Sequence, residues 1–212
     1  MIVAIVSTQE RALNNQLTAN LAVLRARSGH KICIIDADSR CSAYDWSCER
    51  SAAKQRPSVP ARRLAGGPLL REIDELGPAY SDLLINIGGR DTHECHSALI
   101  TARTVIVPVR VQQANLDSQY ALVARLNSAR MFNPLLRVLF VIVTDGAAPS
   151  GEELAAVRLY VAHVMSATLA TTLLHDPCIY EYGRGRCVCD AETCDPEAAA
   201  ELGALYREVY MH

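Results

Sequence analysis

Short apolar runs recur along the chain and alternate with longer segments of mixed polarity. Six of these runs have the length of strands and few polar interruptions, which is typical of strands buried on both faces of a parallel sheet. The six predicted strands are Ile2–Val6, Lys31–Asp36, Asp82–Ile87, Thr104–Val109, Arg137–Val143 and Ala167–Leu174. Strands of this kind predict a parallel sheet at the centre of the fold.

The segments between the strands repeat their apolar residues every three or four positions, as amphipathic helices do. The first of them places Leu13, Leu17, Leu21 and Leu24 on one face, and Gly29 is positioned to end it. Later helices are predicted over residues 69–76, around 116–126, around 154–164 and over about 196–210. Residues 51–67 are rich in proline, glycine and basic residues, which predicts an irregular connection.

Buried strands that alternate with amphipathic helices predict an α/β fold with a doubly wound, mostly parallel sheet. The chain of 212 residues fits a single domain, residues 1–212. In this architecture ligands bind at the carboxyl ends of the strands. Candidate functional residues are therefore expected in the turns that follow the strands.

Composition argues against a membrane-spanning or secreted protein and against an overall electrostatic attraction to nucleic acid. The net charge of −2 gives no overall attraction to nucleic acid or to anionic membranes. No run approaches the roughly 20 apolar residues of a membrane-spanning helix, and the first apolar run is too short for a secretory signal. Eight cysteines without such a signal are expected as reduced thiols, which predicts a cytoplasmic protein. The chain has two lysines, Lys31 and Lys54. The turn directly after the first predicted strand therefore contains no lysine.

Several segments in the same order carry a resemblance to a known family. The chain opens with MIVAIV, continues with LTANLAVLRARSGHK, and reaches IIDADSRCSAYDW, in which Asp36, Asp38, Ser42 and Trp46 are the informative positions. Together with LLINIGGRD and VIVPVRVQQANLD, these segments resemble the ParA/MinD-type deviant Walker ATPases, in particular the short plasmid-partition ParA proteins. The resemblance extends over most of the chain and implies a P-loop NTPase-like fold.

In that family the first turn carries lysines, glycines and a threonine that bind the phosphates of ATP and Mg²⁺. An ungapped correspondence places Glu10 at the signature lysine, Asn15 at the phosphate-binding lysine and Gln16 at the magnesium-binding threonine. Arg11, Ala12 and Asn14 stand where the three glycines are expected. Side chains at these positions obstruct the close approach of the backbone to phosphate. The resemblance therefore implies a degenerate Walker A motif.

The Walker B position of the family's nucleotide site is also altered, because Asn86 stands where an aspartate is expected. Losing the lysine and the metal ligand removes most of the electrostatic stabilisation of phosphoryl transfer. Asp36, Asp38 and Gly89 keep their places. The resemblance thus implies a vestigial nucleotide site without an ATP or magnesium cofactor. Asp36 and Asp38 have a second interpretation, as capping residues of a strand–helix turn.

A basic cluster is the best candidate for a surface that contacts the DNA backbone. Its members are Arg50, Lys54, Arg56, Arg62 and Arg63. The cluster has no interleaved aromatic residues that would stack on bases, and a solvated loop is the alternative interpretation. Arg184 and Arg186 are candidates to extend it, although nothing in the sequence places the two segments side by side.

Two groups of metal-ligand residue types are present, but no metal site is predicted. Cys178, Cys187, Cys189 and Cys194 have the spacing C-x8-C-x-C-x4-C, whereas zinc sites usually contain C-x2-4-C pairs. The run HECH at residues 93–96 lacks a clear fourth ligand. Cys41 and Cys48 lie seven residues apart on a predicted helix and are expected to face the core.

These features favour a ParA-like pseudo-ATPase that acts as a binding or scaffold protein in plasmid or chromosome partition or in cargo positioning. The expected partner is a protein of the centromere-binding or cargo-adaptor type, with non-specific DNA and a second copy as further candidates, and no membrane. A dimer would be joined directly, for example through Glu10 and Arg11. Two alternatives stay open: an ATPase that still binds ATP through Asp36 and Asp38, and a metal- or redox-responsive regulator that uses the C-terminal cysteines.

Overall fold

The computed structural model describes the chain apart from residues 8–10, 65–67, 89–91, 115, 145–146, 176–182, 191–194 and 212, and apart from the side chains of residues 11, 113 and 116–118. The described part contains one sheet of seven parallel strands in the order β3-β2-β4-β1-β5-β6-β7. The strands are β1 (Ile2–Val6), β2 (Ile32–Asp36), β3 (Ala61–Arg63), β4 (Asp82–Ile87), β5 (Thr104–Arg110), β6 (Arg137–Thr144) and β7 (Ala167–His175). The predicted doubly wound α/β fold is confirmed.

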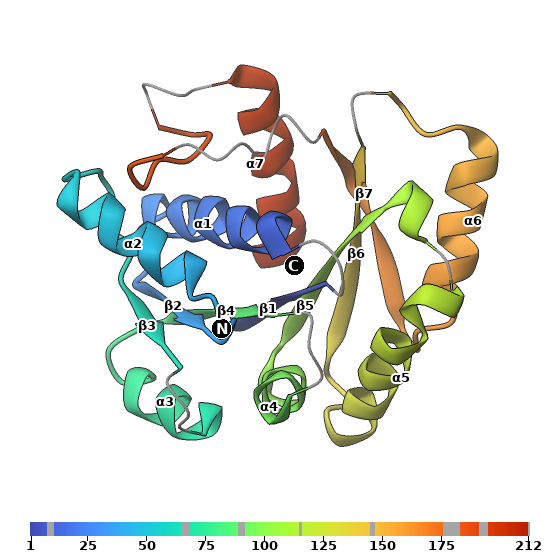
Figure 1. The fold of residues 1–212 in the computed structure, drawn as a ribbon, viewed down its shortest axis with the longest axis horizontal. Coiled ribbons are helices and arrows are strands. Elements are labelled where there is room, and N and C mark those ends of the chain that lie inside the picture. The colour runs from blue at the N-terminus through green and yellow to red at the C-terminus, as the bar shows by residue number, and fades with distance from the viewer. Residues whose placement is uncertain are drawn as a thin grey trace.

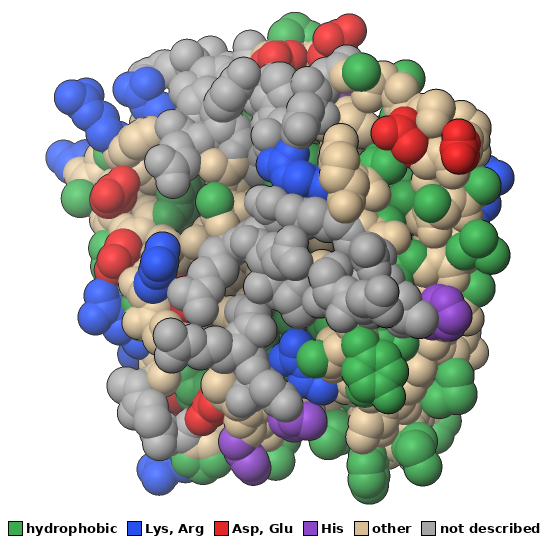
Figure 2. Space-filling view, turned by 45° about the vertical axis from the view of Figure 1, so that its right-hand side comes forward, with side chains coloured by type: hydrophobic (Ala, Val, Ile, Leu, Met, Phe, Trp, Pro, Cys, Tyr) green, Lys and Arg blue, Asp and Glu red, His purple; other side chains and the backbone are tan. Residues whose placement is uncertain are grey.

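Helices cover both faces of this sheet (Figure 1). The helices are α1 (Arg11–Arg27), α2 (Ser42–Ala52), α3 (Leu69–Leu76), α4 (His93–Thr101), η1 (Val111–Gln113), α5 (Leu116–Phe132), α6 (Gly151–Ala162) and α7 (Pro196–Tyr210). Helices α1, α2 and α7 pack on one face, and α3 to α6 pack on the other. Apolar side chains gather on the outside of the molecule on the side of α5 and α6 (Figure 2).

Strand β1 shows why the apolar runs are continuous. It lies between β4 and β5, and its successive side chains enter the two cores in turn. Ala4 and Val6 belong to the core under α3 to α6, whereas Val3 and Ile5 belong to the core under α1 and α7. Because both faces are buried, no position of the strand has to be polar.

Strand β3 was missed, because it lies inside the segment 51–67 that was predicted to be irregular. It is only three residues long, it pairs with β2 at the edge of the sheet, and Arg62 and Arg63 are exposed. An edge strand needs no apolar run, because one of its sides faces solvent.

Arg50 is buried inside the molecule, which corrects its assignment to a basic surface. Its side chain is 0% exposed and forms two hydrogen bonds with the carboxylate of Asp190, at 2.8 and 3.1 Å. The guanidinium also donates to the carbonyl oxygens of Arg56, Pro57 and Gly185. Burial alone would raise the pKa of Asp190, but the hydrogen bonds from Arg50 and the backbone outweigh it, so the pKa is lowered.

The ion pair between Arg50 and Asp190 fastens the segment 183–190 onto α2. The indole of Trp46 donates to the carbonyl oxygen of Arg186 at 2.9 Å, and Arg27 on α1 also pairs with Asp190. Gly185 sits directly against the backbone of Arg50 with a φ of +66°. A Cβ atom at this position would overlap the main chain of Arg50. Only glycine therefore allows this close approach of the two segments.

The pairing of strand β7 with β6 is irregular, and a glutamate of α7 accepts hydrogen bonds from β7 near this irregularity. The register of the two strands shifts between Phe140 and Ile142. The carboxylate of Glu208 accepts hydrogen bonds from the amides and hydroxyls of Thr171 and Thr172, at 2.5 to 3.0 Å. Partial burial opposes ionisation, but these four hydrogen bonds prevail and lower the pKa of Glu208.

We expect Gly185→Ala to lower the free energy of unfolding by about 3 kcal/mol or more, because the added methyl group overlaps the backbone of Arg50 at a positive φ. Urea unfolding followed by circular dichroism measures this change. Gly183→Ala is the matched control in the same turn, since a Cβ atom there meets nothing within 4 Å. Similar losses in the two variants would contradict the close contact at Gly185.

Glu208→Gln should lower the free energy of unfolding by about 1 to 2 kcal/mol at pH 7, because an amide nitrogen replaces one of the two acceptor oxygens. The pKa of Glu208 is lowered in the folded state, so its ionised form contributes stability above the unfolded pKa of about 4.3 and loses it as the pH falls through the folded pKa. The free energies of unfolding of wild type and Glu208→Gln should therefore differ at pH 7 and converge toward pH 3. Glu197→Gln, on the exposed first turn of the same helix, should show no such convergence.

Candidate functional site

The predicted nucleotide site lies where three neighbouring strands end. Strands β2, β4 and β1 are adjacent in the sheet, and α1 and α2 begin shortly after β1 and β2. The carboxyl ends of the strands therefore bring together residues from positions 14–16, 36–41 and 86–88 of the chain. This is the position at which a doubly wound sheet binds its ligands.

The amide of Asn86 is the centre of a hydrogen-bond network at this site. Its Nδ2 donates to Oδ1 of Asn15 at 2.7 Å and to Oδ1 of Asp36 at 3.0 Å. Asn86 is fully buried at the end of β4, and Asp36 is buried at the end of β2. The structure thus brings three of the predicted site residues into direct contact.

Asp36 uses both of its carboxylate oxygens on donors of the protein. Oδ1 accepts from the amide of Asp38 at 3.2 Å and from Asn86, and Oδ2 accepts from the backbone amide of Tyr44 at 2.8 Å. Tyr44 lies in the first turn of α2, so Asp36 caps that helix from the preceding strand. Burial raises the pKa of Asp36, although the three hydrogen bonds oppose this effect.

Asp38 forms the turn between β2 and α2. Its Oδ1 accepts from the amide of Arg40 at 3.2 Å and from the hydroxyl of Ser39 at 3.4 Å. Gly88 lies so close that a Cβ atom there would be 3.2 Å from the carboxyl carbon of Asp38. These contacts are those of a strand–helix turn, as the capping interpretation of the two aspartates requires.

The first turn of α1 contributes two further amide side chains. Asn14 is buried and donates from Nδ2 to the carbonyl oxygen of Ile87 at 3.1 Å, while its Oδ1 is buried without a hydrogen-bond partner. Asn15 and Gln16 are half-buried. Thr18, which the sequence analysis did not single out, donates to the carbonyl of Asn14 at 2.7 Å. Glu10, Gly89 and the side chain of Arg11 lie outside the described residues.

Around Asp36 and Asn86, the described side chains do not match what the phosphates and metal ion of ATP·Mg²⁺ require. A magnesium site needs oxygen ligands that are left open toward the cation. Both oxygens of Asp36 are taken by N–H donors, and the amide group of Asn86 places hydrogens where Asp36 and Asn15 meet. Neither Asn15 nor Gln16 carries a positive charge that could attract a triphosphate.

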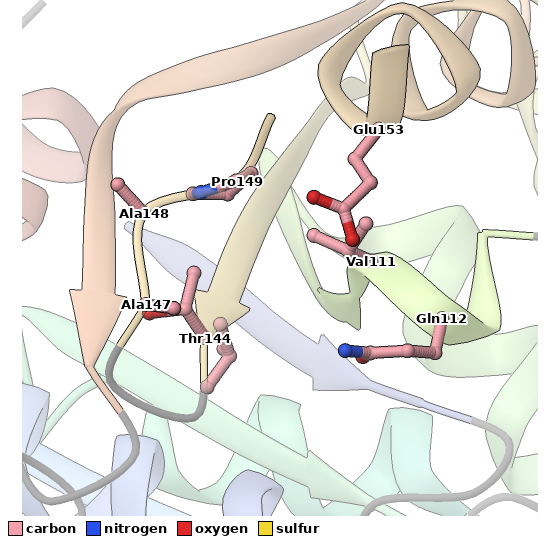
Figure 3. Close-up of a pocket in the computed structure, with 8 residues that line it drawn as sticks. Val111, Gln112, Thr144, Ala147, Ala148, Pro149 and Glu153 are labelled. Carbon is pink, nitrogen blue, oxygen red and sulfur yellow. The ribbon is translucent and has the colours of Figure 1, made fainter. Parts of the chain in front are cut away.

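A separate cavity of about 110 Å³ lies at the carboxyl ends of β5 and β6. Thr144 and Pro149 line one side, and Val111 and Gln112 of η1 line the other together with Glu153 of α6 (Figure 3). Thr144 is 6% exposed, and its hydroxyl has no hydrogen-bond partner. A sequence signal for this cavity is the position of Thr144 directly after the predicted strand Arg137–Val143, where ligands of such folds bind.

The remaining members of the predicted DNA-contacting cluster lie at the surface. Lys54, Arg56 and Arg62 are exposed. Arg63 is also exposed and pairs with Asp45 at 2.7 Å while it stacks on the ring of Tyr44. Arg50, as described above, is buried. The structure also shows that residues 184–186 do lie beside Arg50, through the carbonyl of Gly185.

The described metal-ligand residue types do not converge. Cys187 is buried, and its burial together with the charge of Asp190 raises its pKa to about 12, which disfavours the thiolate that metals bind. Cys178 and Cys194 lie outside the described residues. In the HECH run on α4, His93 and His96 are exposed whereas Cys95 is buried. No group of three or more His, Cys, Asp or Glu that could hold a metal ion occurs among the residues that the structure describes.

The expected core position of Cys48 was wrong. Cys48 is exposed on α2, and Cys41 is half-buried as the residue that precedes this helix, with a φ of +54°. The helix begins at Ser42, so Cys41 does not share its periodicity, and Ala43 and Ser47 face inward instead.

No protein-family model matches the sequence, and no curated protein matches it. Solved structures match nearly its whole length. The cell division ATPase MinD of Pyrococcus furiosus is 19% identical, with a TM-score of 0.68 and coverage of 99% of this chain and 98% of that one. A plasmid partition protein from Borrelia burgdorferi is 13% identical, with a TM-score of 0.64 and coverage of 99% and 97%.

An enzyme of another class is equally similar. Cobyrinic acid a,c-diamide synthase from Mycobacterium smegmatis, solved with a bound ATP analogue and magnesium, is 14% identical, with a TM-score of 0.68 and coverage of 99% of this chain and 95% of that one. At these identities the comparisons establish the fold alone. Function therefore has to be argued from the site.

We expect Asn86→Asp to lower the free energy of unfolding by about 3 kcal/mol at pH 8, because a carboxylate would replace the amide that donates to Asp36 and Asn15. Burial already raises the pKa of Asp36, and a second carboxylate beside it raises the pKa of the pair further. The folded variant then binds more protons than the unfolded chain above a pH of about 4, so its loss of stability shrinks as the pH falls from 8 to 5.

Urea unfolding of wild type and Asn86→Asp at both pH values measures this difference. Asn133→Asp is the control for the loss of a single amide donor, since Asn133 donates to the carbonyl of Ala102 at 2.8 Å. A loss of stability in Asn86→Asp that is equal at pH 5 and pH 8 would show that the two side chains do not interact.

Proposed function

We propose that this chain, which has the fold of the ParA/MinD-type P-loop ATPases, is a ParA-like pseudo-ATPase that works by binding and not by ATP hydrolysis. Its role would be that of a scaffold in DNA partition or in the positioning of a cellular cargo. Two solved structures with this fold, a cell division ATPase and a plasmid partition protein, support the direction of this proposal.

The observation that carries the proposal is the network around Asn86. In a working site of this fold, charged groups surround the phosphates and the metal. Here Asn86 donates to Asp36 and Asn15 within the protein, at 3.0 and 2.7 Å. A ligand that needed the carboxylate of Asp36 would have to displace Asn86 and the backbone amide of Tyr44, whose hydrogen bond caps α2. The site therefore supports a chain that holds one conformation without nucleotide.

The proposed binding partners follow from the fold and from the exposed basic side chains. We propose a protein partner of the centromere-binding or cargo-adaptor type. Non-specific DNA is a second proposed ligand, through the exposed basic side chains of Lys54, Arg56 and Arg62. None of the described helices has the length and apolar character of a membrane span.

Calorimetric titration with ATP in the presence of Mg²⁺ tests the central claim. We expect no binding heat at ATP concentrations up to about 1 mM, which corresponds to less than about 4 kcal/mol of binding free energy. A nucleotide-competent ATPase of the same fold, titrated under identical conditions, is the positive control. A thermal unfolding curve with and without ATP·Mg²⁺ gives an independent reading, because any ligand that binds the folded state raises the melting temperature.

Binding of ATP·Mg²⁺ with a micromolar dissociation constant would overturn the proposal and favour an ATPase that uses Asp36 and Asp38 in an unusual way. Release of inorganic phosphate that depends on magnesium and is lost in Asp38→Asn would do the same.

A further inference from the structure

Exposed apolar side chains concentrate on one part of the surface. Ten large apolar residues are exposed among those the structure describes, and six of them lie on α5, α6 and the turns that follow these helices. We call this surface the α5–α6 face, and its six members are Tyr120 (67% exposed), Met131 (75%), Phe132 (71%), Leu135 (71%), Leu159 (70%) and Met165 (48%). Figure 2 shows the gathering of apolar side chains on this side of the molecule.

Helix α5 is joined by hydrogen bonds to the turn that follows α6. Asn127, in the middle of α5, donates from Nδ2 to the carbonyl of His163 at 2.9 Å and accepts at Oδ1 from the amide of Met165 at 2.8 Å. Both partners lie just after the end of α6. The turn after α6 is therefore held against the middle of α5 by hydrogen bonds.

The α5 part of the α5–α6 face is free of exposed charge. Between Tyr120 and Leu135, no exposed residue is charged. The two arginines in this stretch point elsewhere: Arg125 is 5% exposed, and Arg130 donates to the carbonyl of Leu136. A solvent-facing helix surface normally carries charged and polar residues. An outer helix surface without them is typical of a helix that packs against another protein.

We propose that the α5–α6 face binds the same face of a second copy of this chain, around a two-fold axis at the junction of the two helices. The dimer would lay α5 of each protomer on α6 of its partner. This proposal does not rest on the proposed function, because it uses none of the residues of the vestigial nucleotide site. It also differs from a dimer through Glu10 and Arg11, because neither residue belongs to α5 or α6.

The exposed area agrees with the size of a dimer interface. A large apolar side chain exposes on the order of 200 Å² when it is free, so the six residues together expose roughly 800 Å². A standard-size interface buries about 800 Å² on each partner, whereas the largest apolar patch of a typical monomer is about 300 to 600 Å².

Charge and shape single out a second copy among the conceivable partners. A two-fold interface places the residues near its axis against their own copies, so a charge there would meet a like charge. The α5 half of the face satisfies this requirement, and the exposed charges of the face, such as Glu152 and Arg158, lie on α6.

The face also contains both halves of a knobs-into-holes contact. Met131 and Phe132 project from α5, and α6 exposes the small side chains of Ala155 and Ala162. Leu159 projects from α6, while α5 exposes alanines at positions 121 and 124. Large residues of one copy can therefore pack over small residues of the other in both directions.

Light scattering coupled to gel filtration tests the dimer. Wild-type protein at about 100 μM, far above the dissociation constant of an interface of this size, should have twice the 23.1 kDa mass of the chain. Met131→Glu and Leu159→Arg should each raise the dissociation constant by roughly 100-fold or more, because each places a charge in the apolar contact. Leu70→Glu on α3 is the matched control, since Leu70 is 49% exposed and lies outside the face.

Mixing the two charged variants separates a specific contact from a loss of folding. If α5 meets the partner's α6, Met131→Glu and Leu159→Arg chains should form heterodimers more tightly than either forms homodimers, because opposite charges then face each other. A monomeric wild type would overturn the proposal and point to another partner for this face. A dimer that both variants leave intact, a control that dissociates equally, or a mixture without heterodimers would also overturn it.

Discussion

The buried carboxylate of Asp36 is the constraint on which the architecture of the site depends. A carboxylate is only an acceptor, so each buried oxygen needs a donor from the protein. The backbone of α2 supplies one at Tyr44, the following turn supplies one at Asp38, and β4 supplies one at Asn86. Asn86 in turn holds Asn15 of α1. One acidic group thus aligns two strands and the starts of two helices, a task that a bound cation performs in sites with more carboxylates.

Most of the fold was predictable because burial on both faces leaves a clear trace in the sequence. Strand β1 contains only apolar residues, and the start of α7 is marked by Pro196 after the capping Asp195. Strand β3 was not predictable in this way, because an edge strand of three residues has neither length nor apolar continuity. Its pairing with β2 is set by neighbours in space and not by its own composition.

The sequence predicted which residues form the site, but it did not predict the hydrogen bonds between them. The resemblance pointed to Asn15, Asp36 and Asn86, and the adjacency of β2 and β4 brings them together. The environment of Arg50 could not be read in advance, because its partner Asp190 lies 140 residues away and the turn between them depends on Gly185. From the sequence, an arginine in a basic segment is expected to be exposed, because an acidic partner that is distant in the chain cannot be identified.

The two edges of the sheet have a consequence for how this protein can assemble. At one edge, β3 is short and presents Arg62 and Arg63; at the other, Glu208 occupies the amides of Thr171 and Thr172 in β7. Neither edge offers a long row of free backbone groups to an incoming strand. Growth into fibrils by strand addition is therefore disfavoured from both ends. Association has to proceed through side chains on the helical layers, where a closed assembly can stop growing.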